Sequence, residues 1–165
     1  MNKTPSSNYK VRFNDCDMFG HLNNARYLDY MINARQDHLK ETYNFDYNSY
    51  YKKNLGWVIG YHEIQYLKPA FFDETITIQS SLLNADNESL HVEVLMMNET
   101  KTHLKAILRS KLTLINLKTG RKEQHNTELL EWAKSLIIED VNTHAPIGDR
   151  IKQILIELKQ NSNLN

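Results

Sequence analysis

The order of the predicted elements constrains the fold of this chain most. One strand pattern is followed by a long helical pattern and then by four more strand patterns. Between residues 24 and 40 apolar side chains recur at helical spacing and form a wide stripe, so we expect this helix to be buried rather than to lie on the surface. The stripe consists of Tyr27, Leu28, Met31, Ile32, Ala34 and Leu39.

Alternating apolar and polar residues, typical of half-buried strands, flank this helix. The first strand has Tyr9, Val11 and Phe13 on one face, and the second runs from Trp57 to Lys68. Three more strands have apolar faces made of Ile76, Ile78 and Leu82, of Leu90, Val92, Val94 and Met96, and of Leu104, Ala106, Leu108, Leu112 and Leu114. This order predicts an α+β fold in which a five-stranded antiparallel sheet closes its apolar face around the long central helix.

The rest of the chain adds helices and one irregular segment. Residues 41–56 are rich in tyrosine and asparagine, which indicates an irregular connection whose tyrosines cover core edges, with a lid as the alternative. Helical patterns after Asn126 or Thr127 and at 147–159 predict extra C-terminal helices. We expect residues 1–165 to form a single domain, with a core at about 8–120 and a helical appendage at about 126–161.

Composition excludes several partners. The 20 basic and 20 acidic residues cancel, so no overall positive field would attract nucleic acid. No apolar run approaches the roughly 18 residues of a transmembrane segment, and the first residues lack the apolar stretch of a secretory signal. The single cysteine, Cys16, cannot form an internal disulfide, so we expect a cytoplasmic protein.

A carboxylate stands a few residues before the expected start of the central helix. Asn23 and Asn24 are good residues for a helix start, and the free amides there favour negative charge. Thioester hydrolysis needs a group that activates water and donors aimed at the developing oxyanion. A strong general acid is not required, because a leaving thiol has a pKa of about 8.5. Asp17 is therefore a candidate catalytic residue.

Two segments carry a family resemblance. They are residues 12–27, RFNDCDMFGHLNNARY, and residues 66–74, YLKPAFFDE. Together they resemble the 4-hydroxybenzoyl-CoA thioesterase family of the hotdog superfamily, and the resemblance extends from about Tyr9 to Lys118. The continuation from Gly20 is similar to the Gly-His-Val-Asn-Asn form of its fatty acyl thioesterase members. Aryl-CoA members have a Pro-Ala-Gly turn where Met18-Phe19-Gly20 stands here.

This resemblance implies an acyl-CoA thioesterase of the hotdog fold that releases free acid and CoA. It assigns Asp17 as general base or nucleophile, with the backbone amide near Asn24 as an oxyanion donor. The implied assembly is a homodimer or homotetramer with sites at the subunit interface. The coenzyme A belongs to the substrate, and no other cofactor is expected.

Several residues near Asp17 have open roles. His21 could polarise water, orient Asp17 or contact the substrate, or it could only hydrogen-bond the backbone. Gly20, Asn23 and Tyr27 are the expected substrate-binding residues, although the asparagine also suits a helix cap without touching substrate.

Other candidates have a simpler structural interpretation. Asp17 itself could be a turn residue, and Asp15 is an alternative base that we expect to pair with Arg12. Cys16 lacks an indicated histidine partner, and the seven histidines show no ligand spacing, so no metal is predicted. Coenzyme phosphates could be met by Lys52, Lys53, Lys68, Arg109 and Lys111, although exposed cations of this kind are usually solvated surface.

Two other functions fit the same pattern. The acyl group could be carried by acyl carrier protein in place of CoA, because the sequence shows no diagnostic docking patch. The chain could also be a non-catalytic hotdog protein that binds acyl chains or a protein partner, since a fold alone does not fix function.

Overall fold

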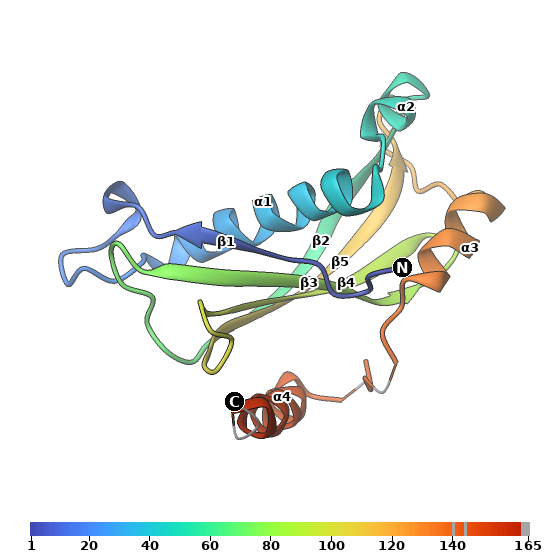
Figure 1. Ribbon diagram of the computed structural model, residues 1–165. Coiled ribbons are helices and arrows are strands. Elements are labelled where there is room, and N and C mark those ends of the chain that lie inside the picture. Colours follow the sequence, from blue (N-terminus) through green and yellow to red (C-terminus); the bar gives the residue numbers. More distant parts are fainter. Residues whose placement is uncertain (140, 144, 163–165) are drawn as a thin grey trace.

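A five-stranded antiparallel sheet forms the centre of the molecule in this computed structural model, which describes residues 1–139, 141–143 and 145–162 (Figure 1). Its strands stand in the order β1-β3-β4-β5-β2. Their bounds are β1 Ser6–Lys10, β2 Leu55–Tyr66, β3 Thr75–Ala85, β4 Ser89–Asn98 and β5 Leu104–Asn116. All four neighbouring pairs are antiparallel, so the predicted number and direction of strands are confirmed.

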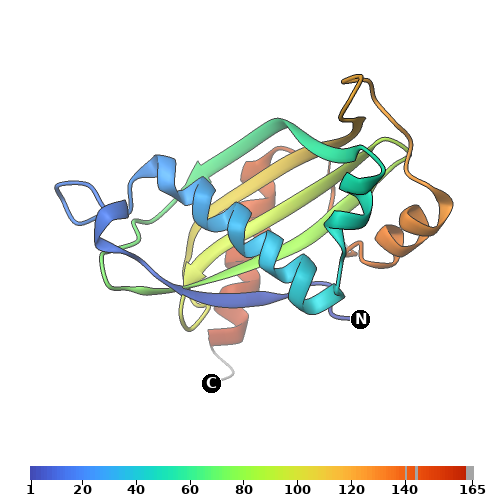
Figure 2. The same ribbon diagram turned by 90° about the horizontal axis from the view of Figure 1, so that it is seen from above.

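Helices cover both faces of this sheet. Their bounds are α1 Asn24–Tyr43, α2 Tyr47–Lys52, α3 Thr127–Ser135 and α4 Ile147–Ser162. The long helix α1 runs across one face, and α4 lies against the other (Figure 2). The predicted central helix and C-terminal helices are therefore confirmed. None of the helices in the described ranges is both long and apolar enough to span a membrane.

Two apolar clusters hold these layers together. From α1, Tyr27, Met31 and Ala34 are buried at helical spacing against the sheet. The sheet contributes Ile76, Ile78, Val94, Met96, Ala106 and Leu108 to this cluster. On the opposite face, side chains of α4 pack on the alternate residues of β4 and β5 in a cluster of Leu95, Met97, Leu104, Ile107, Ile151, Ile154 and Leu158. Strand β4 is consequently buried on both faces.

The central helix is less enclosed than its apolar stripe predicts. One face of α1 is buried, but Asp29, Asn33 and Gln36 on its other side are exposed. Leu28 and Ile32 at the borders of the stripe are half-buried. The sheet therefore packs on one side of the central helix, as predicted, and leaves the other side of the helix exposed in the single chain.

The first strand also ends earlier than predicted. Tyr9 lies in β1 and Val11 is buried just after it, but Phe13 belongs to a short 3₁₀ helix, Phe13–Asp15, and is 74% exposed. The alternating pattern fails there because the chain leaves the sheet after Val11, which exchanges its last hydrogen bonds with Glu74 and Asp73.

The tyrosine-rich segment 41–56 is more ordered than an irregular connection. Helix α1 continues to Tyr43, and Tyr47–Lys52 form the short helix α2. Their aromatic rings pack with Trp57 of β2 and Trp132 of α3. The prediction that these tyrosines cover core edges is confirmed, while the predicted lack of regular structure is wrong.

Candidate active site

The loop between β1 and α1 forms a tight turn that positions Asp17. The Asp17 N–H donates to the His21 carbonyl over 2.8 Å, and the Gly20 N–H donates to the Asp17 carbonyl over 3.0 Å. Gly20 has a φ of 74°, a left-handed conformation that glycine adopts without steric cost. The glycine is therefore a backbone requirement of the turn that carries Asp17.

Backbone amides fix the Asp17 carboxylate through one of its oxygens. Oδ1 accepts hydrogen bonds from the N–H groups of Phe19, over 2.9 Å, and His21, over 3.1 Å. Within the described part of the chain Oδ2 accepts no hydrogen bond. One carboxylate oxygen thus holds the side chain in place, and the other is available to water or a ligand.

The start of α1 lies beside this carboxylate. The Asn23 side chain caps the helix by accepting from the Ala25 N–H over 3.0 Å. The Asn24 N–H, at the first helical position, has no intrahelical acceptor and donates no hydrogen bond to any described residue. An unused donor and the positive end of the helix dipole are the features that stabilise an oxyanion.

Asp17 and Asn24 line the same cleft, which has a volume of about 250 Å³. The complete lining is Asp17, His21, Leu22, Asn24, Tyr27, Tyr66, Leu67, Lys68 and Pro69. The cleft therefore combines the loop before α1 with the end of β2, two segments about 40 residues apart in the sequence.

Two tyrosines fasten β2 to the helix start. The Tyr66 hydroxyl donates to the Asn24 carbonyl over 2.9 Å, and the Tyr27 hydroxyl accepts from the Ala70 N–H over 3.0 Å. Their rings meet edge to face with centroids 5.1 Å apart. Burial raises the pKa of Tyr27, and its hydrogen bond from the Ala70 backbone lowers it in part. The raised pKa favours the protonated hydroxyl of Tyr27.

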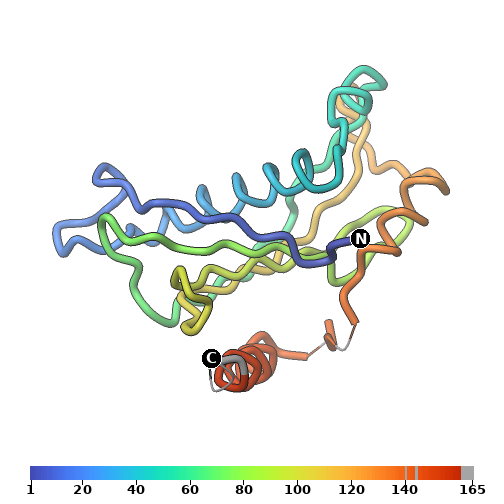
Figure 3. The backbone as a smooth tube through the Cα atoms, viewed as in Figure 1, coloured from blue at the N-terminus to red at the C-terminus, as the bar shows by residue number. Residues whose placement is uncertain are grey.

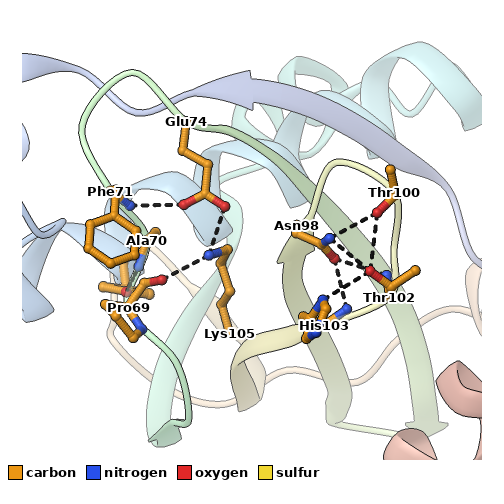
Figure 4. A network of polar contacts seen from close by, with 10 residues as sticks. Pro69, Ala70, Phe71, Glu74, Asn98, Thr100, Thr102, His103 and Lys105 are labelled. Carbon is orange, nitrogen blue, oxygen red and sulfur yellow. Dashed lines mark hydrogen bonds and ion pairs between the residues drawn. The ribbon is translucent and has the colours of Figure 1, made fainter.

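A buried lysine stabilises the chain that follows β2 (Figure 4). Lys105 Nζ donates to the Pro69 carbonyl and pairs with Glu74, both over 2.8 Å. The second carboxylate oxygen of Glu74 accepts from the Phe71 N–H over 2.9 Å. This network holds the backbone around Pro69, which forms one wall of the cleft.

The turn at Asp17 is joined directly to this wall. The Leu22 N–H donates to the Ala70 carbonyl over 2.8 Å, and the Phe72 N–H donates to the Gly20 carbonyl over 2.9 Å. In the backbone tube the two segments run side by side at one end of the molecule (Figure 3). Two backbone hydrogen bonds between distant parts of the sequence therefore hold the Asp17 turn beside the segment that follows β2.

The structure brings together four of the six residues singled out from the sequence. Asp17, His21, Asn24 and Tyr27 line the cleft, whereas Gly20 and Asn23 do not. Gly20 makes the turn, and the Asn23 side chain is used as the helix cap. Sequence reasoning missed the contribution of Leu22, Tyr66, Leu67 and Pro69, and it offered Lys68 only as a candidate for the coenzyme phosphates. The YLKPA segment was the available signal, because it holds three of the four missed residues.

The neighbouring carboxylate is engaged elsewhere. Asp15 Oδ2 accepts from the Tyr30 hydroxyl over 2.8 Å, and Oδ1 lies 3.7 Å from Arg26 Nε. The expected pairing of Asp15 with Arg12 is therefore wrong. Asp15 ties the loop to α1, and it is absent from the cleft lining.

Cys16 has the environment of a structural thiol. It packs against the main apolar cluster, and its Sγ lies 3.4 Å from the Arg12 carbonyl. Burial raises the pKa of Cys16, and the charges of Asp15 and Asp17 raise it further. The thiolate needed for nucleophilic attack is disfavoured there.

The candidate phosphate-binding cations differ in their surroundings. Lys68 lines the cleft and Lys111 is exposed. Arg109 is buried and paired with Glu93, so its interpretation as a solvated surface cation is wrong. In the described ranges no group of three or more His, Cys, Asp or Glu side chains could hold a metal ion.

The chain has an antiparallel sheet with a long helix on one face and a carboxylate beside the start of that helix. These features define a hotdog-type thioesterase architecture. The chain belongs to the thioesterase-like superfamily, whose family model matches residues 11–133.

Individual proteins show the same similarity. The chain is 28% identical over 128 residues to the long-chain acyl-CoA thioesterase FadM of Escherichia coli (strain K12), covering 78% of this chain and 96% of that relative. The crystal structure of YbaW, a probable thioesterase from Escherichia coli, has a TM-score of 0.69 at 27% identity, covering 81% of this chain and 98% of that chain. DHNA-CoA thioesterase from Staphylococcus aureus has the same fold, with a TM-score of 0.72 at 17% identity, covering 80% of this chain and 89% of that chain. The predicted hotdog fold is confirmed.

Proposed function

We propose that this protein hydrolyses acyl-CoA thioesters to a free acid and CoA, in the cleft lined by Asp17 and Asn24. One observation carries the proposal: Asp17, which has a free carboxylate oxygen, and Asn24, which has an unused N–H, line the same cleft. Membership of the thioesterase-like superfamily and the similarity to FadM support it.

In the proposed reaction Asp17 acts on the thioester carbonyl in one of two ways. As a general base, it takes a proton from a water molecule while the resulting hydroxide attacks the carbonyl carbon. As a nucleophile, it attacks that carbon directly, and water then hydrolyses the mixed anhydride. In both routes the Asn24 N–H stabilises the oxyanion, and the C–S bond breaks to release the CoA thiolate.

The other cleft residues have positioning roles in this proposal. His21 donates its backbone N–H to the Asp17 carboxylate, so it orients Asp17 whatever its ring does. Tyr66 fixes the first residue of α1 through its bond to the Asn24 carbonyl. The exposed ammonium of Lys68 at the cleft is the candidate for contact with the coenzyme.

The acyl group and its carrier are finer points of the proposal. FadM is named for long-chain acyl-CoA, and the turn Met18-Phe19-Gly20 differs from the Pro-Ala-Gly turn of aryl-CoA enzymes. We therefore favour a fatty acyl-CoA over 4-hydroxybenzoyl-CoA. Acyl carrier protein stays an alternative carrier, and comparing the turnover of one acyl group on both carriers decides between them.

The proposed working form is a homodimer or homotetramer with the cleft at the subunit interface, each chain acting as a single domain. Strand β2 supports this because it lies at the sheet edge and exposes Val58, Ile59 and Tyr61. Met18 and Phe19, beside Asp17, are 89% and 73% exposed. Apolar surface of this kind is typical of a protein interface. Light scattering of the purified protein gives the assembly directly.

The catalytic proposal is tested by a pair of matched substitutions. Asp17→Asn removes the carboxylate of the cleft, and Asp15→Asn makes the same chemical change two residues away, outside the cleft lining. We expect Asp17→Asn to lower kcat by about 10²–10⁴-fold, the usual contribution of a general base, and Asp15→Asn to retain activity. Steady-state hydrolysis of acyl-CoAs of increasing chain length measures both variants and identifies the preferred acyl group.

Two results would contradict the proposal. Equal activity of the wild type and Asp17→Asn would remove the catalytic role, and tight acyl-CoA binding without turnover would favour a non-catalytic acyl-binding protein. A single turnover in ¹⁸O-labelled water separates the two mechanisms. The general-base route places ¹⁸O only in the free acid, whereas ¹⁸O in the Asp17 carboxylate identifies the nucleophile route, because only an anhydride opened at its aspartyl carbon carries solvent oxygen there.

A further inference from the structure

A second cavity lies at the other end of α1, far from Asp17. It has a volume of about 150 Å³ and is enclosed by α1, α2, α3 and the sheet. Arg35, which faces it, stands eleven residues after Asn24 in α1, or about 16 Å along the helix axis. None of its lining residues belongs to the Asp17 cleft, so the two sites are separate within one chain.

The walls of this cavity are aromatic and aliphatic. The rings of Phe45, Tyr47, Trp57 and Trp132 line it, together with aliphatic side chains from the helix and the sheet. A smaller cavity of about 50 Å³ adjoins it and shares Arg35 and Trp132. An apolar cavity of about 150 Å³ accommodates a ligand the size of benzene, so the larger cavity suits an apolar body of about six carbon atoms.

One cation faces this apolar space without a counter-ion. Arg35 is partly buried and forms no salt bridge with the carboxylates of the described residues. Its polar partner is the Tyr47 hydroxyl. Burial lowers the pKa of Arg35, and the Tyr47 hydroxyl offsets this only in part. A charge held partly out of water is stabilised by an opposite charge, so the guanidinium can pair with an anion that enters from outside the chain.

We propose that this cavity binds a monocarboxylate with a compact apolar body, its carboxylate on Arg35 and Tyr47 and its body against Trp57 and Trp132. The planar guanidinium matches a carboxylate through two parallel N–H donors. The aromatic walls favour a ligand whose remaining surface is apolar, and disfavour inorganic phosphate, which is strongly hydrated on all sides. Binding at this site does not depend on the proposed hydrolysis.

The chain has a built-in reporter for this test. Its only two tryptophans, Trp57 and Trp132, both line the cavity. Titration of the full-length protein with sodium hexanoate should give a saturable change in tryptophan fluorescence. Hexan-1-ol, which has the same body without the charge, and inorganic phosphate should give none at the same concentrations.

Substitutions locate the bound carboxylate. Arg35→Met keeps much of the side-chain volume and removes the charge, and should weaken hexanoate binding by about tenfold or more. Arg26→Met is the matched control, because Arg26 is an exposed arginine of the same helix that is already paired with Asp29. It should leave the affinity unchanged. Tyr47→Phe removes one hydroxyl and should weaken binding by roughly threefold or more.

The proposal has clear failing outcomes. It is overturned if hexanoate gives no saturable change, if hexan-1-ol binds equally well, or if Arg35→Met binds with the affinity of the wild type. Should Arg35→Met not fold, an unchanged affinity in Tyr47→Phe overturns it instead. Loss of binding in Lys68→Met would place the carboxylate in the other cleft, whereas retained binding in that variant supports the separate site even if the protein proves inactive.

Discussion

Replacing Glu93 by glutamine tests how α4 is held on the sheet. Glu93, on β4, is fully buried and accepts hydrogen bonds from Arg150 of α4 over 3.0 Å and from Arg109 of β5 over 3.2 Å. Glutamine has nearly the same shape but no charge, so the substitution leaves buried Arg109 without a counter-ion and buried Arg150 with only the half-exposed Glu157, 3.6 Å away. Removing one partner of a buried ion pair costs about 3–5 kcal/mol of unfolding free energy. For a chain of this size we expect Tm to fall by about 6–20 °C.

Urea unfolding followed by circular dichroism measures this change. Glu157→Gln is the matched control, because Glu157 is about half exposed and lies 3.6 Å from Arg150. Its loss should change the unfolding free energy by no more than about 1 kcal/mol. Replacing Glu93, Arg109 and Arg150 together by methionine should restore much of the stability, since no unpaired charge then remains. A Glu93→Gln protein within about 1 kcal/mol of the wild type would refute this account of α4 docking.

Three further perturbations follow from the contacts described above. Asn23→Ala removes the cap of α1 and should lower the free energy of unfolding in urea by about 0.5–2 kcal/mol. It should also lower kcat, because the Asn24 amide is then no longer fixed. Unchanged stability would contradict the capping role. Burial lowers the pKa of His38, so the unfolded state binds more protons below about pH 6.5. Stability should therefore fall as the pH drops from 7.5 to 5, by at most about 1.4 kcal/mol per unit from this group, and less steeply in His38→Gln. Burial and, second, the hydrogen bond to Asp37 raise the pKa of Tyr9 to about 12. In an ultraviolet titration of the tyrosines, Tyr9→Phe should therefore show one fewer phenol that ionises near pH 12.

Local spacing explains what could be predicted of the fold. The strand patterns of β1 to β5 and the helical stripe of α1 predicted five strands and the long helix, because each pattern depends on neighbours within one element. The same reasoning failed at Phe13, where the chain leaves the sheet although the alternation continues. It also failed for α2, whose Tyr47 and Tyr50 pack on Trp57 of β2, and for Phe45 just before it, which packs on Trp132, nearly 90 residues further on.

The candidate site also has some features that local sequence predicts and others that depend on the tertiary structure. The sequence by itself determined that a carboxylate stands just before a capped helix, because the turn at Gly20 and the cap at Asn23 are local structures. The sequence favoured Asp17 and left Asp15 as the alternative base. Only the tertiary structure shows that the Tyr30 hydroxyl donates to Asp15, whereas Asp17 lines the cleft.

Only the tertiary structure also brought Tyr66 to the start of α1 and left Arg35 facing an apolar cavity. Both features depend on side chains that meet across the fold, and spacing along the chain carries no information about such distant contacts. The sequence fixes which groups are available and in which elements they lie. Packing of those elements decides which groups share a cleft and which charge is left without a partner, because burial and pairing are properties of the assembled layers.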